Sequence, residues 1–507
     1  MGVKRQMKLR YKISFFVLFV PLLLISCVKE EQFLTDSSAK LTFSEDTVMF
    51  DTVFATMATV TRQVKVYNNY DEPLLIDAVT LQGSGASRFR INVDGDSSRV
   101  ARDVEIGAHD SIFIFIQANI NPNDQTSPYL VEADIAFNFN QKQQTLPVIA
   151  YGRNAVYHLP TYTHQIYTLY INRWGQVDTN WIPFSIIDCD NWDHTKPHVI
   201  FGYAVVNSNE TLHLTAGDEL YFGDNSCLWV YDSATLDVRG TLQAPVLFTS
   251  IRHDGYYDSL PGQWKQIWLS AGSKDNHIEW ARIENATIGL LVDTNVNSNP
   301  TLEIYNSVIQ NHSMAGIIGQ GAYIVGDNLL VSCCGECLAA LQYGGRYEFT
   351  NSTFANYWRY QTRKTPSVIL NNYYQYDAST VFPRPLQQAD FKNCIIYGNY
   401  SGSNNSGEIQ FDWLDGCTFN CSFNNCLLKT SLVDINGNAT YAPAPYITGG
   451  NLIINNDPKF KDVYGHDYGL EEDSPAIGAG NSAYLKSNTD LKGNPRGNPP
   501  TIGAFEN

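Results

Sequence analysis

Hydrophobic and polar residues alternate in short segments along the first third of the chain. The segment Val60-Thr-Arg-Gln-Val64-Lys-Val66 shows this alternation, and residues 74–76, 111–116 and 131–139 continue the series of strand-like runs. A period of two predicts half-buried β-strands, and the turn-forming residues between the runs predict short connections. The pattern therefore predicts a β-sandwich over residues 40–155.

The second half of the chain repeats a different pattern, an asparagine followed by large apolar residues. The spacing between successive copies is 22, 23, 42 and 32 residues, and the copies begin at Asn306, Asn328, Asn351, Asn393 and Asn425. A recurring period near 22 residues is typical of a solenoid in which each repeat forms one coil. The apolar positions favour Val, Ile, Phe and Cys, which suit strands. The repeat therefore predicts a parallel β-helix with insertions in the two longer coils.

Equivalent positions of such a solenoid stack from coil to coil. A buried asparagine at a bend can hydrogen-bond to its neighbours and satisfy the turning backbone. We therefore interpret the five asparagines as a structural ladder rather than as ligand-binding residues.

The N-terminus has the pattern of a targeting segment. Five Lys or Arg residues precede an apolar run over residues 13–25, which is short for a membrane span. The run ends in Leu24-Ile25-Ser26-Cys27, which resembles a bacterial lipobox. The resemblance implies a signal peptide over residues 1–26, lipidation of Cys27 and a lipidated tether over residues 27–39. A plain signal peptide or a short anchor helix is the alternative.

The residues after the lipobox carry a second resemblance. Lys29, Glu30 and Glu31 resemble the surface-export signal of Bacteroidota lipoproteins. The resemblance implies a lipid-anchored protein of the outer membrane that faces the cell exterior.

The charge of the chain excludes one class of partner. The formal net charge is −17, and cleavage before Cys27 would change it to −22 because five basic residues leave. No basic patch or stripe interrupts the acidic sequence, so we expect no binding to nucleic acid. An acidic chain is also repelled by anionic lipid, so we expect the acyl chains to provide the membrane attachment.

Two further resemblances concern the fold. Val64-Lys-Val66-Tyr-Asn68 and Pro73-Leu-Leu-Ile76 resemble the immunoglobulin-like domains of the abnormal-spindle type, which implies a spacer or a protein-binding stalk. The C-terminal motifs resemble the closing signature of Bacteroidota right-handed parallel β-helix lipoproteins; they include Asp457-Pro458, residues 474–480 and residues 502–506. This resemblance implies an all-β protein in which residues 156–507 form a right-handed parallel β-helix with a C-terminal cap.

The candidate ligand-binding residues lie in the insertion between Asn351 and Asn393, where the spacing of the repeat is longest. Aromatic rings with interleaved cations could hold a sugar, an acidic glycan or a protein partner. The alternative is a loop whose rings are buried against the solenoid wall. The candidates are Tyr357, Trp358, Arg359, Tyr360, Arg363, Tyr373, Tyr374 and Tyr376.

Three other patches have weaker patterns. Glu408, Asp412, Trp413 and Asp415 could form a sugar-cleaving site, and Asp188, Asp190, Asp193 and His194 could bind calcium or zinc, but a solvated loop is the simpler interpretation of both. Cys333, Cys334 and Cys337 resemble half of a zinc site, and no second cluster completes it. We therefore expect no metal and no cofactor, and calcium is unsupported.

The function predicted from these patterns is non-catalytic. No repeated carboxylate pair falls in register between the repeats, whereas cleavage of a polysaccharide needs acidic or basic groups that converge from adjacent coils. We expect a surface lipoprotein that binds a glycan or an outer-membrane protein partner. A β-helix polysaccharide lyase or glycoside hydrolase is the alternative.

Overall fold

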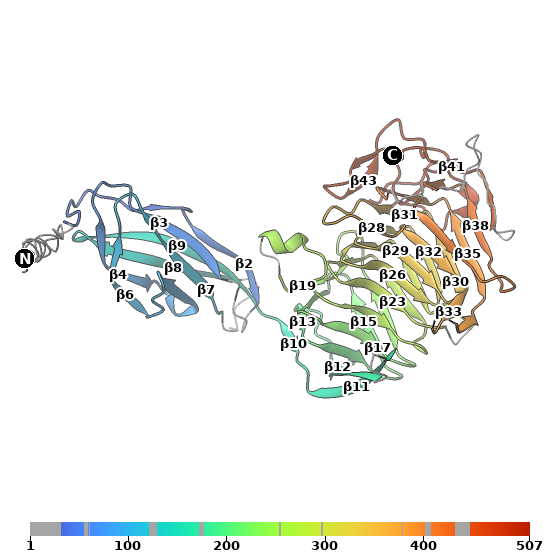
Figure 1. The fold of residues 1–507 in the computed structure, drawn as a ribbon, viewed down its shortest axis with the longest axis horizontal. Helices are drawn as coiled ribbons and strands as arrows, with labels where there is room; N and C mark the ends of the chain where they lie inside the picture. Colours follow the sequence, from blue (N-terminus) through green and yellow to red (C-terminus); the bar gives the residue numbers. More distant parts are fainter. Residues whose placement is uncertain are drawn as a thin grey trace, which may run out of the picture. The chain divides into compact units, whose positions relative to one another are not determined.

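The computed structural model describes residues 32–54, 59, 61–120, 129–171, 177–252, 255–295, 298–377, 379–400, 407–430 and 447–507. Cys27 and the expected export residues Lys29, Glu30 and Glu31 lie outside these ranges. The chain divides into two compact units, residues 1–153 and 154–507. Regular structure in the described ranges is strand apart from short 3-10 segments, so the prediction of an all-β protein is confirmed (Figure 1). In these ranges no helix has the length and apolarity needed to span a membrane.

The N-terminal unit contains two sheets around one hydrophobic core. Val64 and Val66 of β3 and Ile114 of β7 point into this core and are fully buried, as the period of two requires. All strand pairs are antiparallel except β2 with β9. One sheet has the order β1 (Thr42–Phe43), β3 (Arg62–Tyr67), β7 (Ser111–Ala118) and β5 (Phe89–Val93). The other has the order β2 (Val48–Phe54), β9 (Lys142–Arg153), β8 (Tyr129–Phe139), β4 (Leu74–Gln82) and β6 (Val100–Ile106).

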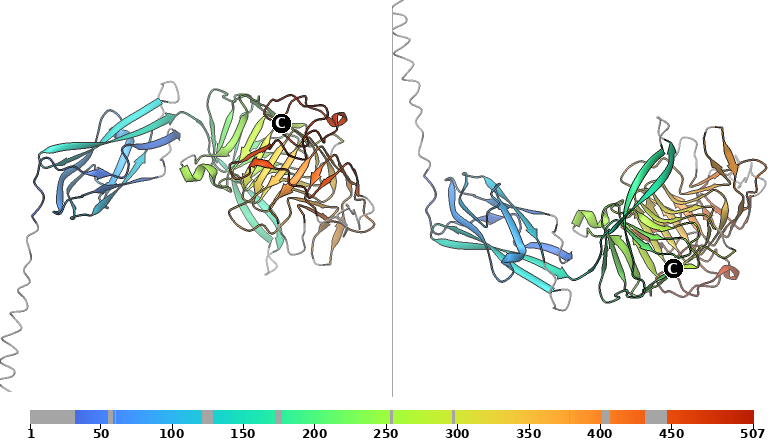
Figure 2. Two further views of the ribbon diagram at one scale, coloured as in Figure 1. Left: turned by 90° about the horizontal axis from the view of Figure 1, so that it is seen from above. Right: turned by 90° about the horizontal axis from the view of Figure 1, so that it is seen from below.

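The C-terminal unit contains three long sheets of 11, 10 and 9 strands. Apart from the antiparallel pair β11 and β12, every strand pair in them is parallel. Successive coils follow one another in chain order from green to red (Figure 1, Figure 2). This arrangement is consistent with a β-helix or solenoid, in which each coil contributes one strand to each sheet.

The strands of the three sheets are as follows. The 11-stranded sheet contains β10 (Val156–His158), β13 (His198–Ile200), β16 (Glu219–Phe222), β19 (Val246–Ser250), β22 (Ala281–Glu284), β25 (Val308–His312), β28 (Leu330–Cys334), β31 (Thr353–Asn356), β36 (Ile395–Gly398), β39 (Leu427–Leu428) and β41 (Ile453–Ile454). The 10-stranded sheet contains β11 (Tyr162–Ile171), β12 (Val177–Ile186), β14 (Tyr203–Val206), β17 (Cys227–Val230), β20 (Gln266–Leu269), β23 (Ile288–Val292), β26 (Ala315–Gln320), β29 (Cys337–Gln342), β32 (Val368–Asn371) and β37 (Ile409–Asp412). The 9-stranded sheet contains β15 (Thr211–Thr215), β18 (Thr235–Arg239), β21 (Asn276–Glu279), β24 (Leu302–Tyr305), β27 (Tyr323–Asp327), β30 (Gly345–Thr350), β35 (Leu386–Lys392), β38 (Cys421–Asn424) and β40 (Ile447–Gly450).

Stacked apolar side chains fill the interior of the coils. Phe349, Phe391 and Phe423 occupy one register of the 9-stranded sheet, and their ring centroids lie 5.5 and 5.1 Å apart. All three rings are buried, and each buried side chain of this size contributes about 1.5–3 kcal/mol. The apolar residue two places before the repeat asparagine is therefore a core position.

The repeat asparagines lie at the corner between the 9-stranded and 11-stranded sheets. Asn306, Asn328, Asn351, Asn393 and Asn425 all have left-handed backbones, with φ between 46° and 56°. Asparagine tolerates this conformation better than most residues. Asn328 Nδ2 donates to Asn306 Oδ1 at 2.7 Å, and Asn393 Nδ2 donates to Asn351 Oδ1 at 3.0 Å. The asparagines therefore turn the chain and connect successive coils.

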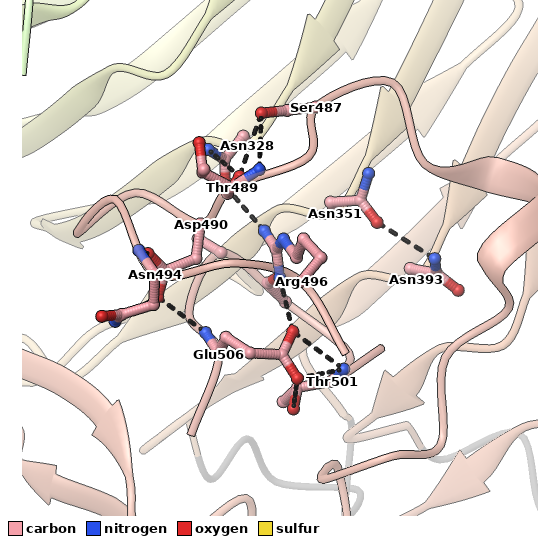
Figure 3. A network of polar contacts seen from close by, with 12 residues as sticks. Asn328, Asn351, Asn393, Ser487, Thr489, Asp490, Asn494, Arg496, Thr501 and Glu506 are labelled. Carbon is pink, nitrogen blue, oxygen red and sulfur yellow. Dashed lines mark hydrogen bonds and ion pairs between the residues drawn. The ribbon is translucent and has the colours of Figure 1, made fainter. Parts of the chain in front are cut away.

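The C-terminal segment, which the sequence predicts to include a cap, lies along this corner. Arg496 Nη2 donates to Asn328 Oδ1 at 2.7 Å (Figure 3). Asn481 N donates to Asn393 Oδ1 at 2.8 Å. Ala504 packs with residues of β28 and β31, and Ile502 packs with residues of β36 and β39. The segment, which includes the hairpin β42 (Phe460–Asp462) and β43 (Asp467–Leu470), therefore covers four coils from the side.

Candidate ligand-binding groove

The structure separates the predicted aromatic patch into two groups. Tyr357, Trp358, Arg359 and Tyr360 belong to the first group, in which Trp358 is buried, Tyr357 is half-buried, and Arg359 and Tyr360 are exposed. The side chain of Trp358 is 5% exposed, and the Tyr357 ring packs on Phe460 with centroids 6.1 Å apart. Arg359 Nη1 and the Tyr360 hydroxyl donate to backbone carbonyls at 3.4 and 2.8 Å. None of these four residues lines the groove formed by the second group, and ligand binding by the exposed Arg359 and Tyr360 stays a prediction.

Arg363 is buried in an ion pair and does not face solvent as a ligand-binding cation would. Its Nη2 donates to both carboxylate oxygens of Glu408 at 2.7 and 3.0 Å. The side chains are 2% and 0% exposed, so neither can meet a polymer in solvent. Arg363, a candidate ligand-binding residue, and Glu408, a candidate sugar-cleaving residue, therefore form a buried ion pair with each other.

The second group lies on a hairpin formed by β33 (Tyr373–Gln375) and β34 (Val381–Pro383). Tyr373 donates its hydroxyl to Asp412 Oδ2 at 2.6 Å, and this hydrogen bond raises the pKa of Tyr373 to about 12. Tyr374 and Tyr376 instead line a groove. The structure therefore brings two of the eight predicted residues to one site.

The groove has a volume of about 1090 Å³ and is built from five successive coils, which are those that contain β20, β23, β26, β29 and β32. Its residues come from the turns between the 10-stranded and 9-stranded sheets, from the adjoining strands and from the β33–β34 hairpin. Its aromatic residues are Trp268, Tyr323, Tyr343, Tyr374 and Tyr376; its hydroxyl and amide residues are Thr294, Asn295, Ser298, Gln320, Gln375 and Gln387; its cations are Arg346 and Arg384. No Asp or Glu is among the lining residues of the described chain.

Glycine allows the segments around the groove to approach one another. Gly344 has φ of 67°, and a Cβ there would lie 2.3 Å from the carbonyl oxygens of Arg384 and Pro385. Gly345 has φ of 108°, and its Cβ would lie 2.4 Å from the carbonyl oxygen of Ala322. Real Cβ atoms do not make such contacts, so the turn before β30 depends on glycine.

The aromatic residues of the groove support one another. The Tyr343 and Tyr374 rings meet edge to face with centroids 5.1 Å apart, and Tyr374 stacks on Phe382 at 6.3 Å. Trp268 stacks on Trp229 at 4.8 Å, and its Nε1 donates to Asp293 Oδ2 at 2.7 Å. Burial raises the pKa of Asp293. Preorganised rings of this kind present flat apolar faces with polar edges.

The other predicted patches do not form a site. Trp413 Nε1 donates to Asp415 Oδ1 at 3.2 Å. Asp193 accepts hydrogen bonds from Lys196 and Thr195, which lower its pKa, and His194 Nδ1 lies 2.8 Å from Asp218 Oδ2. These carboxylates are occupied by local partners.

The cysteine cluster is buried and free of disulfides. Burial raises the pKa of Cys333 to about 11 and that of Cys337 to about 12, so the thiols stay protonated. Within the ranges that the structure describes, no three His, Cys, Asp or Glu side chains are placed to hold a metal ion.

A second cavity of about 510 Å³ contains carboxylates that sequence reasoning missed. Glu219, Asp258, Arg282 and Glu284 line it, beside the 11-stranded sheet. Tyr221 donates its hydroxyl to Glu219 Oε2 at 2.7 Å, and Arg282 pairs with Glu284. The pairing of β16, β19 and β22 brings Glu219 to the same sheet as Arg282 and Glu284, and Asp258 comes from the 3-10 segment Gly255–Ser259.

No protein-family model and no curated protein sequence matches this chain. Among solved structures, the catalytic unit of a thermostable GH87 α-1,3-glucanase from Streptomyces thermodiastaticus covers 78% of this chain and 89% of its own, with 9% identity and a TM-score of 0.23. A family 123 glycoside hydrolase from Clostridium perfringens covers 24% of this chain, with 11% identity and a TM-score of 0.18. This chain spans only 28% of that enzyme's length.

A PapD-like domain of human CEP192 covers 25% of this chain and 92% of its own, with 13% identity and a TM-score of 0.16. Likenesses with such low TM-scores do not establish an activity. The class defined by the fold is an all-β protein with large parallel sheets, consistent with a β-helix or solenoid.

Proposed function

We propose that this protein is a lipid-anchored surface protein of a Bacteroidota outer membrane that binds a glycan without cleaving it. In this proposal Cys27 carries the lipid, residues 40–155 form an immunoglobulin-like stalk, and residues 156–507 form a right-handed parallel β-helix that presents the groove. The lipobox-like residues before Cys27 support the anchor. The alternation of strands and turns in the N-terminal unit supports the stalk.

The composition of the groove is the observation that carries the binding function. Aromatic faces pack against the C–H faces of sugar rings, and amides and guanidinium groups bond to hydroxyl groups. Hydrolysis of a glycosidic bond requires a pair of carboxyl groups in most enzyme families. The described lining residues supply aromatic, amide and guanidinium groups and no carboxylate. A volume of about 1090 Å³ suits several units of a polymer better than one small molecule.

A glycan array probed with the purified protein tests this function. We expect binding to at least one polysaccharide and a loss of about tenfold or more in affinity for Tyr374→Ala with Tyr376→Ala, because the stacking rings are removed. Tyr464→Ala is the matched control, since Tyr464 is 58% exposed and lies outside the groove. Equal binding by the groove variant and the control would place the site elsewhere.

The anchor is tested separately by Cys27→Ala in the native host. We expect the variant to leave the membrane fraction and to appear in the soluble fraction, because the acyl chains provide the attachment. Retention in the membrane fraction would refute the lipid anchor.

The carboxylate cavity favours a second candidate function, glycoside hydrolysis. Glu219, Asp258 and Glu284 line it together with Arg282, and paired carboxyl groups are the usual catalytic groups of glycosidases. Release of reducing ends from an array-positive polysaccharide, abolished by Glu284→Gln, would establish this alternative. Unchanged polymer length after prolonged incubation with the wild type would support binding alone.

A further inference from the structure

We infer that the groove takes an anionic glycan, whose sugars carry carboxylate or sulfate groups. This inference rests on the proposed function and names its ligand class. It depends on Arg346 and Arg384, which no sequence motif singled out.

Arg346 is held in place but keeps part of its hydrogen-bonding capacity. Its Nε donates to Gln387 Oε1 at 2.6 Å, and its guanidinium carbon lies 5.6 Å from the centroid of the Tyr323 ring. Its Nη1 and Nη2 make no hydrogen bond or ion pair with any described residue. A guanidinium fixed through Nε and stacked on a ring presents the other two nitrogens as a fork, which matches a carboxylate or sulfate.

Arg384 has a fixed backbone and an unpaired side chain. Its N–H donates to the Asn372 carbonyl at 2.8 Å, and its own carbonyl lies against Gly344. The side chain is exposed and pairs with no residue of the described ranges. The return strand of the hairpin therefore places a second cation on the same groove.

Arg346 and Arg384 differ from four other arginines of the same unit, and they share the lack of a carboxylate partner in the described ranges with Arg359, which lies outside the groove. Arg239, Arg282, Arg363 and Arg496 of the same unit each form an ion pair with a carboxylate. The chain as a whole carries a net charge of −17, so carboxylates are abundant partners. Arg346 and Arg384 pair with no carboxylate of the described ranges and lie among aromatic rings, so they form a local cationic site in an acidic protein. Physiological salt screens the repulsion between the protein's other carboxylates and the ligand beyond about 8 Å. The two arginines can therefore attract an anionic ligand at short range.

Two pairs of polymers test the ligand class in full-length protein. Polygalacturonate is compared with its methyl-esterified form, and dextran sulfate with dextran, by affinity electrophoresis. We expect at least one anionic polymer to bind about tenfold or more tightly than its neutral partner. The pair that shows the preference distinguishes carboxylate from sulfate. The preference should fall as salt rises, as ion pairing requires.

The arginines are tested with Arg346→Gln/Arg384→Gln. We expect this double variant to lower the ratio of the affinity for the anionic polymer to that for its neutral partner, by roughly three- to tenfold for each arginine. Arg99→Gln/Arg102→Gln changes the net charge equally in the N-terminal unit and should keep the preference. Because both groove arginines are exposed, the fluorescence-monitored unfolding of the double variant should match that of the wild type.

Each outcome decides between the two proposals. Equal affinity of the wild type for anionic and neutral polymers, or an unchanged preference in Arg346→Gln/Arg384→Gln, overturns the anionic ligand and leaves glycan binding in place. Absence of wild-type binding to all four polymers and to the array overturns both.

Discussion

The ion pair between Arg363 and Glu408 allows a quantitative test of how the insertion is held. Glu408 is fully buried, and its carboxylate accepts from Arg363, from the Ser367 hydroxyl and from the Tyr400 N–H. The test substitution is Glu408→Gln, which keeps the size of the side chain and removes its charge. The guanidinium of Arg363 then remains buried with only neutral acceptors, such as Asn399 Oδ1 at 3.3 Å.

We expect Glu408→Gln to lower the free energy of unfolding by about 3–5 kcal/mol, the usual cost of leaving one charge of a buried pair alone. The two Arg363 contacts at 2.7 and 3.0 Å support this magnitude, because each hydrogen bond to a charged group contributes about 1.5–3 kcal/mol. Replacement of both residues, Arg363→Met with Glu408→Leu, should recover part of the loss, because no isolated charge remains buried.

Urea unfolding followed by tryptophan fluorescence measures the effect on one unit alone. All nine tryptophans lie beyond residue 153, so the signal reports the C-terminal unit. Glu336→Gln is the control; this exposed residue of the same unit should change stability by less than about 0.5 kcal/mol. A Glu408→Gln effect no larger than that of the control would refute the claim that the pair holds the insertion in place.

Three further predictions concern the ladder, acid stability and the groove. Asn351→Ala should cost about 2–4 kcal/mol in urea unfolding, because it removes buried hydrogen bonds and places alanine at φ of 46°; a loss below about 1 kcal/mol would contradict the ladder. Burial lowers the pKa of His312 to about 3, whereas the unfolded residue protonates near 6.5. Stability should therefore be complete above pH 6.5 and fall as the pH drops toward 3, with a shallower fall in His312→Gln; identical pH profiles would exclude this cause. Gly344→Ala should weaken glycan binding with a smaller effect on unfolding, because its Cβ would displace the Arg384 segment; unchanged affinity would show that the turn does not shape the groove.

The architecture of this protein could be predicted because its determinants are local. The alternation around Val64 and the repeat around Asn351 each lie within one strand or one turn. A strand's period of two and a residue's tolerance of left-handed φ act over a few neighbouring residues. These patterns predicted the all-β fold and the large parallel sheets.

The candidate site could be predicted only in part. Tyr374 and Tyr376 were found because aromatic residues concentrate in one insertion, but the same signal selected Trp358, which is buried, and Tyr357, which is half-buried. Ring composition does not distinguish a loop that packs on the wall from one that faces solvent. The orientation of each segment depends on contacts with distant coils.

The sequence alone determined the coil, its length and the position of its insertions. The tertiary structure decided which charges line the groove and which pair with one another. Arg363 and Glu408 are 45 residues apart and pair because adjacent coils stack, whereas Arg346 and Arg384 both line the groove, whose described lining residues include no carboxylate. The physical reason is that burial and electrostatic pairing depend on distances across coils, which local periodicity does not encode.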